Sequence, residues 1–368
     1  MGVKGYCEVG RSLIGKWRTW SRYPVSLWVR SLRSNAALEA IAKASEEKVP
    51  NVVLYNYPSF SGAYSALFAH LFHSHHNIPC LILPFSSVEP LRVEDLTSEG
   101  LETCYLLDFL CPKEFLLKLS QQSECKVIGF DHRKSAISCI PDANDCPENL
   151  TIHASLEKSS SSAVYEYFST KHADIGNPDG VVPSLLDSKA KVRVELVLKY
   201  IEDGDLHRWS LPSIRAFNIG LGEWRSKFNC LANPYMYEQL LELSADDLIA
   251  KGNSYLSSQQ NAASKLLGKV FRVRLGRGFY GECLGVRADG NSNLSDEIGK
   301  LLSAKSAAAG LRPVGAVIFM QRNNLKMCLR STDNATDTSE IAKAYGGGGS
   351  PSSSSFIIRM DEYNQWIR

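Results

Sequence analysis

Acidic and histidine side chains follow short apolar runs in this sequence, a pattern that can hold a metal ion. Asp108 comes directly after Tyr-Leu-Leu, and Asp131 with His132 comes after Val-Ile-Gly-Phe. Carboxylate and imidazole groups are suitable ligands for Mn²⁺ or Mg²⁺, so metal-assisted hydrolysis is the first chemistry to consider. The next residue, Arg133, cannot bind a metal because its guanidinium offers only donors. It is well suited to a phosphate group.

Two simpler interpretations of these residues stay open at this point. Asp108 and Asp131 are equally well explained as caps of the helices that follow them. Four histidines close together also resemble a metal cluster, but they lie in the half of a predicted helix that is far from the strand end. We expect them on a solvated or partly buried face. They are His70, His73, His75 and His76.

Apolar strands alternate with helical segments through the first half, which predicts a parallel, doubly wound α/β sheet covered on both faces. The predicted strands are 51–57, 78–85, 102–109 and 125–131, and the predicted helices are 62–75 and 112–122. The ligand crevice of such a sheet lies at the carboxyl ends of its strands. Asn56, Asp108 and Asp131 stand at three of these ends, so we expect them in one crevice.

The second half changes pattern twice. Residues 189–266 have mostly helical spacing, and the residues after them read as a smaller mixed-sheet α/β domain with several strands. The predicted organisation is therefore a basic N-terminal extension, a first domain, a helical connector and a C-terminal domain. Their boundaries are 1–49, 50–188, 189–266 and 267–368.

Taken together, these motifs resemble the DHH phosphoesterase superfamily, which includes RecJ-type exonucleases and oligoribonucleases. Its Asp-His-His signature falls on Asp131, His132 and Arg133. The C-terminal part resembles the DHH-associated domain, with Arg330-Ser331, Ile341-Ala342 and then YGGGGSPSSSSF. The resemblance spans roughly residues 51 to 360. It implies hydrolysis of a phosphodiester by two metal ions, usually manganese, in a cleft between the two domains.

The sequence departs from the family at the first motif. Asn56 stands where a His is expected and Ser61 where a metal-bridging Asp is expected, while Ser59 falls near a further Asp. An amide and two hydroxyl groups are poor metal ligands at neutral pH. These departures predict that the two-metal centre is impaired or lost.

The metal ligands that the resemblance leaves are Asp108, His132 and an acid in EDGDLHRW. We expect Asp205 to be that acid, with Asp203 as the alternative, and we expect Asp131 to orient His132 rather than bind metal. Such a set would hold at most one weakly bound divalent cation, Mn²⁺ or Mg²⁺.

Phosphate contacts are expected to survive better than the metal ligands. Arg133 replaces a His that the family is thought to use for substrate phosphate. In the C-terminal domain the resemblance implies further contacts from Arg330, Ser331 and the glycine run Gly346–Gly349, with Ser350 in the place of a His. Backbone N–H groups of such a run can bind an anion, so we interpret it as a structured loop rather than a linker.

These features predict a divergent DHH-type phosphoesterase-like protein that binds nucleotides or short oligonucleotides and has impaired or lost two-metal hydrolysis. The alternative is an active metal-dependent phosphodiesterase or oligoribonuclease with an altered metal site. The sequence leaves the choice between enzyme and pseudoenzyme open, and it is compatible with a homo-oligomer.

Charge and composition limit the partners and the compartment. Residues 1–38 hold seven basic residues against one acid, while the whole chain of 368 residues has a net charge of only +2. The rest of the chain therefore shows no basic stripe for a long nucleic acid. No apolar run reaches the roughly 18 residues of a transmembrane helix. We expect an intracellular protein, cytoplasmic or, if residues 1–38 act as a transit peptide, organellar. Trp209, Trp224 and Trp366 are typical of packing positions.

Overall fold

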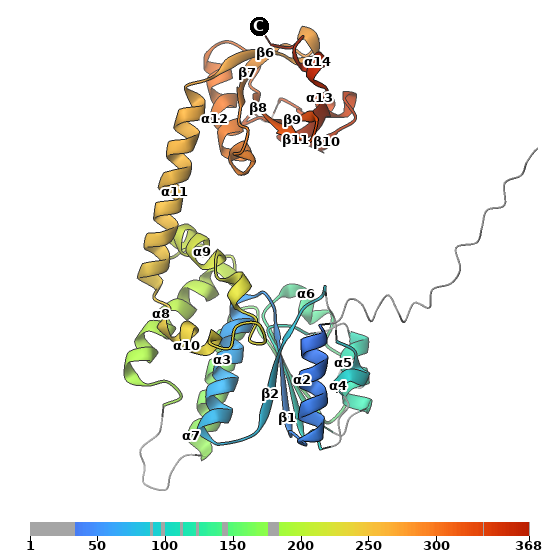
Figure 1. Ribbon diagram of the computed structural model, residues 1–368, viewed down its shortest axis with the longest axis vertical. Helices are drawn as coiled ribbons and strands as arrows, with labels where there is room; N and C mark the ends of the chain where they lie inside the picture. Colours follow the sequence, from blue (N-terminus) through green and yellow to red (C-terminus); the bar gives the residue numbers. More distant parts are fainter. Residues whose placement is uncertain are drawn as a thin grey trace, which may run out of the picture. The chain divides into compact units, whose positions relative to one another are not determined.

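The computed structural model describes residues 34–88, 91–96, 100–110, 113–122, 125–141, 146–175, 184–333 and 335–367. The chain forms two compact units (Figure 1). The first unit extends to Ile214 and includes Gly222–Ala245, and the second comprises Arg215–Leu221 and the chain from Asp246 onward. Residues 1–33, which carry most of the predicted basic extension, lie outside the described residues. Among the described residues, no helix has both the length and the hydropathy needed to cross a bilayer.

A five-stranded sheet forms the centre of the first unit, with the order β2-β1-β3-β4-β5 and every neighbouring pair parallel. Its strands are β1 (Asn51–Asn56), β2 (Cys80–Phe85), β3 (Thr103–Leu107), β4 (Lys126–Asp131) and β5 (Leu150–Ala154). Val52 to Tyr55 are all buried, as expected for a strand covered on both faces. The predicted doubly wound α/β fold is therefore confirmed.

Helices cover both faces of this sheet, as Figure 1 shows. One face carries α3 (Phe60–His75) and α7 (Ser160–Ile175), and the other carries α2 (Asn35–Glu46), α4 (Val93–Leu96) and α5 (Lys113–Gln122). The unit is completed by α6 (Lys134–Ile137), α8 (Ser188–Asp205), η1 (Arg225–Lys227) and α10 (Met236–Glu242).

Two helices of the predicted connector belong to the second unit. They are α9 (Ile214–Gly222), most of which lies there, and α11 (Ala245–Leu267). Glycine lets their backbones touch, because a Cβ added at Gly252 would lie 1.8 Å from the carbonyl oxygen of Ala216. This close crossing fixes α9 against α11.

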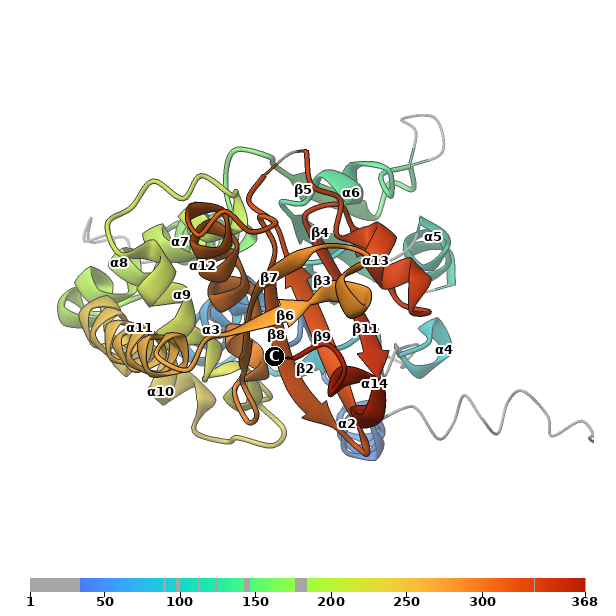
Figure 2. The same cartoon turned by 90° about the horizontal axis from the view of Figure 1, so that it is seen from above.

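The sheet of the second unit has six strands in the order β10-β11-β9-β8-β7-β6, and only the β7–β8 pair is parallel. The strands are β6 (Phe271–Arg274), β7 (Glu282–Arg287), β8 (Gly315–Gln321), β9 (Asn324–Arg330), β10 (Gly348–Ser350) and β11 (Ser353–Ile358). Its helices are η2 (Leu275–Gly278), η3 (Ser292–Leu294), α12 (Ser295–Ala308), α13 (Ser339–Ala344) and α14 (Met360–Tyr363). This architecture confirms the predicted mixed-sheet α/β domain (Figure 2).

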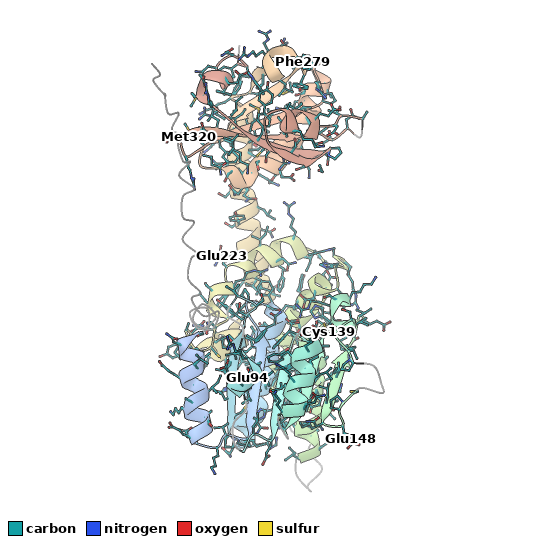
Figure 3. The ribbon with its side chains drawn as sticks, turned by 90° about the vertical axis from the view of Figure 1, so that its right-hand side faces the viewer. Glu94, Cys139, Glu148, Glu223, Phe279 and Met320 are labelled. Atoms are coloured by element: carbon teal, nitrogen blue, oxygen red, sulfur yellow. The ribbon has the colours of Figure 1, made fainter. Side chains whose placement is uncertain are left out.

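Alternating side chains build a core on each face of this second sheet. Val317 and Cys328 pack with residues of α12, whereas their neighbours Ile318 and Met327 pack with Trp366 and the α13 side. Trp366 is fully buried, as the sequence predicted. Figure 3 labels Phe279, which follows β6 and is 85% exposed, so this aromatic ring stays outside both cores.

Candidate functional site

Asp108 occupies a strained backbone position at the carboxyl end of β3. Its φ is +65°, in the left-handed region that is unfavourable for a residue with a side chain. The residue is only 1% exposed. Its Oδ2 accepts a hydrogen bond from Nδ2 of Asn56 at 3.0 Å. Strain of this kind is concentrated at functional sites, which makes Asp108 a strong candidate for a functional residue.

The segment between β1 and α3 supplies donors rather than metal ligands. Ser59 caps α3, because its hydroxyl oxygen accepts from the N–H of Gly62. Gly62 lets the helix start rest on the strand end, since a Cβ there would lie 2.1 Å from the carbonyl oxygen of Asn56. This packing places the hydroxyl of Ser61 where it donates to Oδ2 of Asp205 at 2.6 Å. Asn56 and Ser61 therefore each donate a hydrogen bond to a carboxylate.

His132 lies between the two carboxylates of Asp108 and Asp205. Its Nδ1 lies 3.2 Å from Oδ1 of Asp108, and its Nε2 lies 3.9 Å from Oδ2 of Asp205. The same Nδ1 is 2.9 Å from the hydroxyl of Ser160 at the start of α7. Oδ1 of Asp108 has no well-directed hydrogen bond, so the contact with His132 is chiefly an ion pair. The three predicted metal-ligand candidates thus meet in one cluster.

Asp203 and Asp205 have separate functions at the end of α8. Asp205 contacts Ser61 and faces His132, whereas the carboxylate of Asp203 accepts hydrogen bonds from Ser210 and Leu211. Residues two apart on a helix point to different sides, so both cannot reach the same cluster. The structure places Asp205 in the cluster and Asp203 in the turn that follows.

Asp131 is fully occupied by hydrogen bonds. Its carboxylate accepts from the backbone N–H groups of Leu110, His132 and Arg133 at 2.8–3.0 Å. It also accepts from Nε and Nη2 of Arg133 at 2.9 and 2.8 Å. Nη2 of Arg133 additionally donates to the carbonyl oxygen of Asp108 at 2.8 Å. Asp131 therefore holds Arg133 and the ends of β3 and β4 in place.

The charges of this cluster shift its titration. Burial raises the pKa of Asp108, but the contact with His132 and its charge outweigh this, so the pKa lies below its usual range. Burial lowers the pKa of His132, but the contact with Asp108 raises it by more. Burial and the negative charge of Asp108 raise the pKa of Asp205 to about 6. His132 thus retains its proton to higher pH and offsets part of the negative charge.

The donor set does not fit the two metal ions that the family resemblance implies. Ligand atoms of Asp108, Asp131 and His132 lie within 4.8 Å of one another, the only such group found among the described residues. Yet both oxygens of Asp131 are hydrogen-bonded to Arg133 and to backbone N–H groups. Asn56 and Ser61 add hydrogen-bond donors where a second metal would need anionic ligands. A second cation therefore has no complete ligand set.

The predicted phosphate contacts of the second unit meet only in part. Arg330, Gly348 and Gly349 line a hollow of about 420 Å³, together with residues that the sequence analysis missed, chiefly Lys326 and Ser353–Ser355. Ser331 instead bonds within its own turn, to Asp333. Nε of Arg330 donates to Asp296 at 2.8 Å, so this guanidinium is already paired.

The glycine run is ordered structure. Gly346 ends α13 with a φ of +72°, and Gly348–Ser350 form β10, which pairs with β11. Gly347 is required by close packing, because a Cβ there would lie 2.2 Å from the carbonyl oxygen of Ser355. The run therefore continues the sheet at the rim of the hollow.

The four histidines of α3 have structural surroundings. His73 is 3% exposed and its Nδ1 contacts the carbonyl oxygen of Ala69. His70 stacks on Tyr237, and His76 bonds to His172 of α7. These contacts account for the histidines without a metal. Ser160, by contrast, belongs to the cluster but was not predicted, because its strand β5 was missed.

No protein-family model matches the chain, and no curated protein sequence does. Solved structures do align with most of it. RecJ in complex with Mn²⁺ from Thermus thermophilus aligns over 90% of this chain and 53% of its own, with 13% identity and a TM-score of 0.32. The pGpG-specific phosphodiesterase PggH from Vibrio cholerae aligns over 86% and 95%, with 12% identity and a TM-score of 0.33. CDC45 from Entamoeba histolytica aligns over 89% and 97%, with 10% identity and a TM-score of 0.34.

RecJ and a further match described as a DHH domain carry the name of the superfamily that the sequence motifs resemble. The motif resemblance and these structural matches thus indicate the same type of fold. Identities of 10–14% and TM-scores of 0.32–0.34 describe a distant likeness and establish no activity. The chemistry of this chain has to be argued from its own side chains.

Proposed function

We propose that this protein is a divergent DHH-type phosphoesterase-like protein that binds phosphate-containing ligands, nucleotides or short oligonucleotides, and has lost efficient two-metal hydrolysis. The observation that supports this best is the pair of hydrogen bonds from Asn56 to Asp108 and from Ser61 to Asp205. Each donor stabilises a carboxylate that would otherwise require a cation.

Binding has its own support in each unit. In the first unit Arg133 is held by Asp131 but is still 43% exposed on its side chain, so an anion can approach the guanidinium. In the second unit Lys326 lines a hollow with glycine and serine residues. Charge-assisted contacts of this kind suit phosphate oxygens.

One cation can still be accommodated at Asp108, His132 and Asp205. Mn²⁺ or Mg²⁺ bound there would act as a Lewis acid toward a phosphoryl oxygen. The cluster also supports a second candidate function, an active phosphodiesterase with an altered metal site, because three ligand-type atoms lie within 4.8 Å.

Calorimetry and product analysis distinguish these two functions. We expect at most one weak site in a titration with MnCl₂, measurable binding of a mononucleotide, and negligible cleavage of an RNA dinucleotide. Two tight manganese sites, together with cleavage that Asp108→Ala abolishes, would establish the enzyme instead. No binding of any phosphate compound would refute both.

A further inference from the structure

The turn that follows Asp205 has an unusual backbone, and Trp209 lies within it. His207 and Trp209 have left-handed φ values of 53° and 51°, although neither is glycine. Such a conformation is unfavourable for a residue as large as tryptophan. The turn therefore requires interactions that hold it in this form.

Burial of the indole does not supply them. Trp209 is 54% exposed, whereas Trp366 is fully buried in the second unit. The sequence analysis expected both as packing residues, and for Trp209 this expectation is wrong. An exposed aromatic ring on a strained backbone indicates a role outside the core.

Polar contacts fix the turn on both sides. The buried carboxylate of Asp203 accepts from the N–H of Ser210 at 3.0 Å and from its hydroxyl. On the other side, Nη2 of Arg208 donates to the carbonyl oxygen of Glu157 at 2.6 Å. The indole is therefore presented by a rigid frame before any ligand binds.

This frame lies next to the candidate site in the chain and in the fold. The turn begins directly after Asp205, which contacts Ser61 and faces His132. Glu157, to which Arg208 bonds, follows strand β5. Ligands of parallel sheets bind at the carboxyl ends of the strands, where this segment lies.

We propose that Trp209 is a stacking platform for the base of a mononucleotide, or the terminal base of a short oligonucleotide, whose phosphate binds at Arg133. This inference rests on the function proposed above and adds the feature that would distinguish nucleotides from other phosphates. An exposed indole face attracts any base by stacking, largely independently of sequence. A rigid presentation reduces the ordering cost of binding.

Calorimetry with three ligands tests the platform. The ligands are adenosine 5′-monophosphate, ribose 5-phosphate and inorganic phosphate. Trp209→Ala should weaken binding of the nucleotide about tenfold and leave ribose 5-phosphate unchanged, because only the nucleotide has a base to stack. Trp209→Phe should retain most of the affinity. Ile175→Ala is the matched control, since this exposed apolar residue lies at the opposite end of α7 from Ser160.

The outcomes separate the two proposals. Equal affinity of wild type and Trp209→Ala for the nucleotide would overturn the platform, while binding of ribose 5-phosphate would leave the proposed function intact. If the wild type binds none of the three compounds, both proposals fail. Should the alanine variant not fold, Trp209→Leu keeps the bulk without the aromatic face and should show the same selective loss.

Discussion

The guanidinium of Arg133 and the carboxylate of Asp131 form a two-pronged ion pair, with Nε 2.9 Å from Oδ1 and Nη2 2.8 Å from Oδ2. The Asp131 side chain is 2% exposed, while that of Arg133 is 43% exposed. The acid is thus enclosed and the base is accessible. The same arginine can hold the strand ends together and still meet an anion from solvent.

Removal of this arginine should destabilise the protein. Arg133→Ala leaves a buried carboxylate supported only by backbone N–H groups, which should cost about 1–3 kcal/mol, since the exposure of Arg133 moderates the full penalty of a broken buried pair. Urea unfolding measures the difference. Arg133→Lys keeps the charge but loses the fork, so an intermediate loss is expected. Equal stability of all three proteins would contradict the structural role.

Restoring an acid at Asn56 should restore cation dependence. Asn56→Asp places a second carboxylate beside Oδ2 of Asp108, and the repulsion between them favours a bound cation. We expect the affinity for Mn²⁺ to rise at least about tenfold and Tm to depend on manganese concentration. Asn77→Asp adds the same charge at the exposed far end of α3 and should change neither quantity. An unchanged titration of the Asn56 variant would count against our account of the lost metal site.

Neutralising Asp205 should stabilise the protein. The pKa of this carboxyl is raised by burial and by the charge of Asp108, from 3.8 to about 6. A carboxyl with a higher pKa in the folded chain opposes folding once it ionises, so the cost is absent below pH 3.8 and complete above about pH 6. Asp205→Asn should therefore raise the free energy of unfolding by about 2–3 kcal/mol at pH 7.5. The gain should vanish near pH 4, with EDTA present throughout. A gain that is independent of pH would show that packing, and not ionisation, is responsible.

The hollow of the second unit should bind short oligonucleotides through Lys326. Lys326→Gln should weaken binding of a short single-stranded RNA and reduce the slope of log K against log salt by about 0.7, the value for one lost phosphate contact. Lys305→Gln removes a charge from the end of α12 outside the set of residues that line the hollow, and serves as control. A slope that falls equally in both variants would indicate a general charge effect.

The central strands of both sheets could be predicted because their apolar runs are long and bounded by polar turns. Strand β5 could not, since Leu150–Ala154 is an edge strand with partly exposed residues and no continuous apolar run. With β5 the sequence analysis also lost Ser160, which follows it and contacts His132. Strand β10 was missed because glycine and serine have low strand propensity, and the close backbone packing that requires them is visible only in the fold.

The site was predictable in composition and not in connectivity. Asp108, His132 and Asp205 were expected together, and they meet. The pairing of Asp131 with Arg133 depends on the reach of a side chain back to the end of its own strand, which spacing does not determine. The choice between Asp203 and Asp205 needed the helix phase of α8, and the exposure of Trp209 depends on a left-handed backbone that no residue type announces.

The hairpin built from the glycine run constrains the length of a tract that looks repetitive. Gly348 pairs with Ser355 and Gly349 with Ser354, and the hydroxyl of Ser354 is buried against Thr338. Loss or gain of one residue would shift this register and turn Ser354 to the opposite face. Tracts of identical codons change length easily when DNA is copied. Here each such change would break a buried contact, so the number of glycines is set by the sheet.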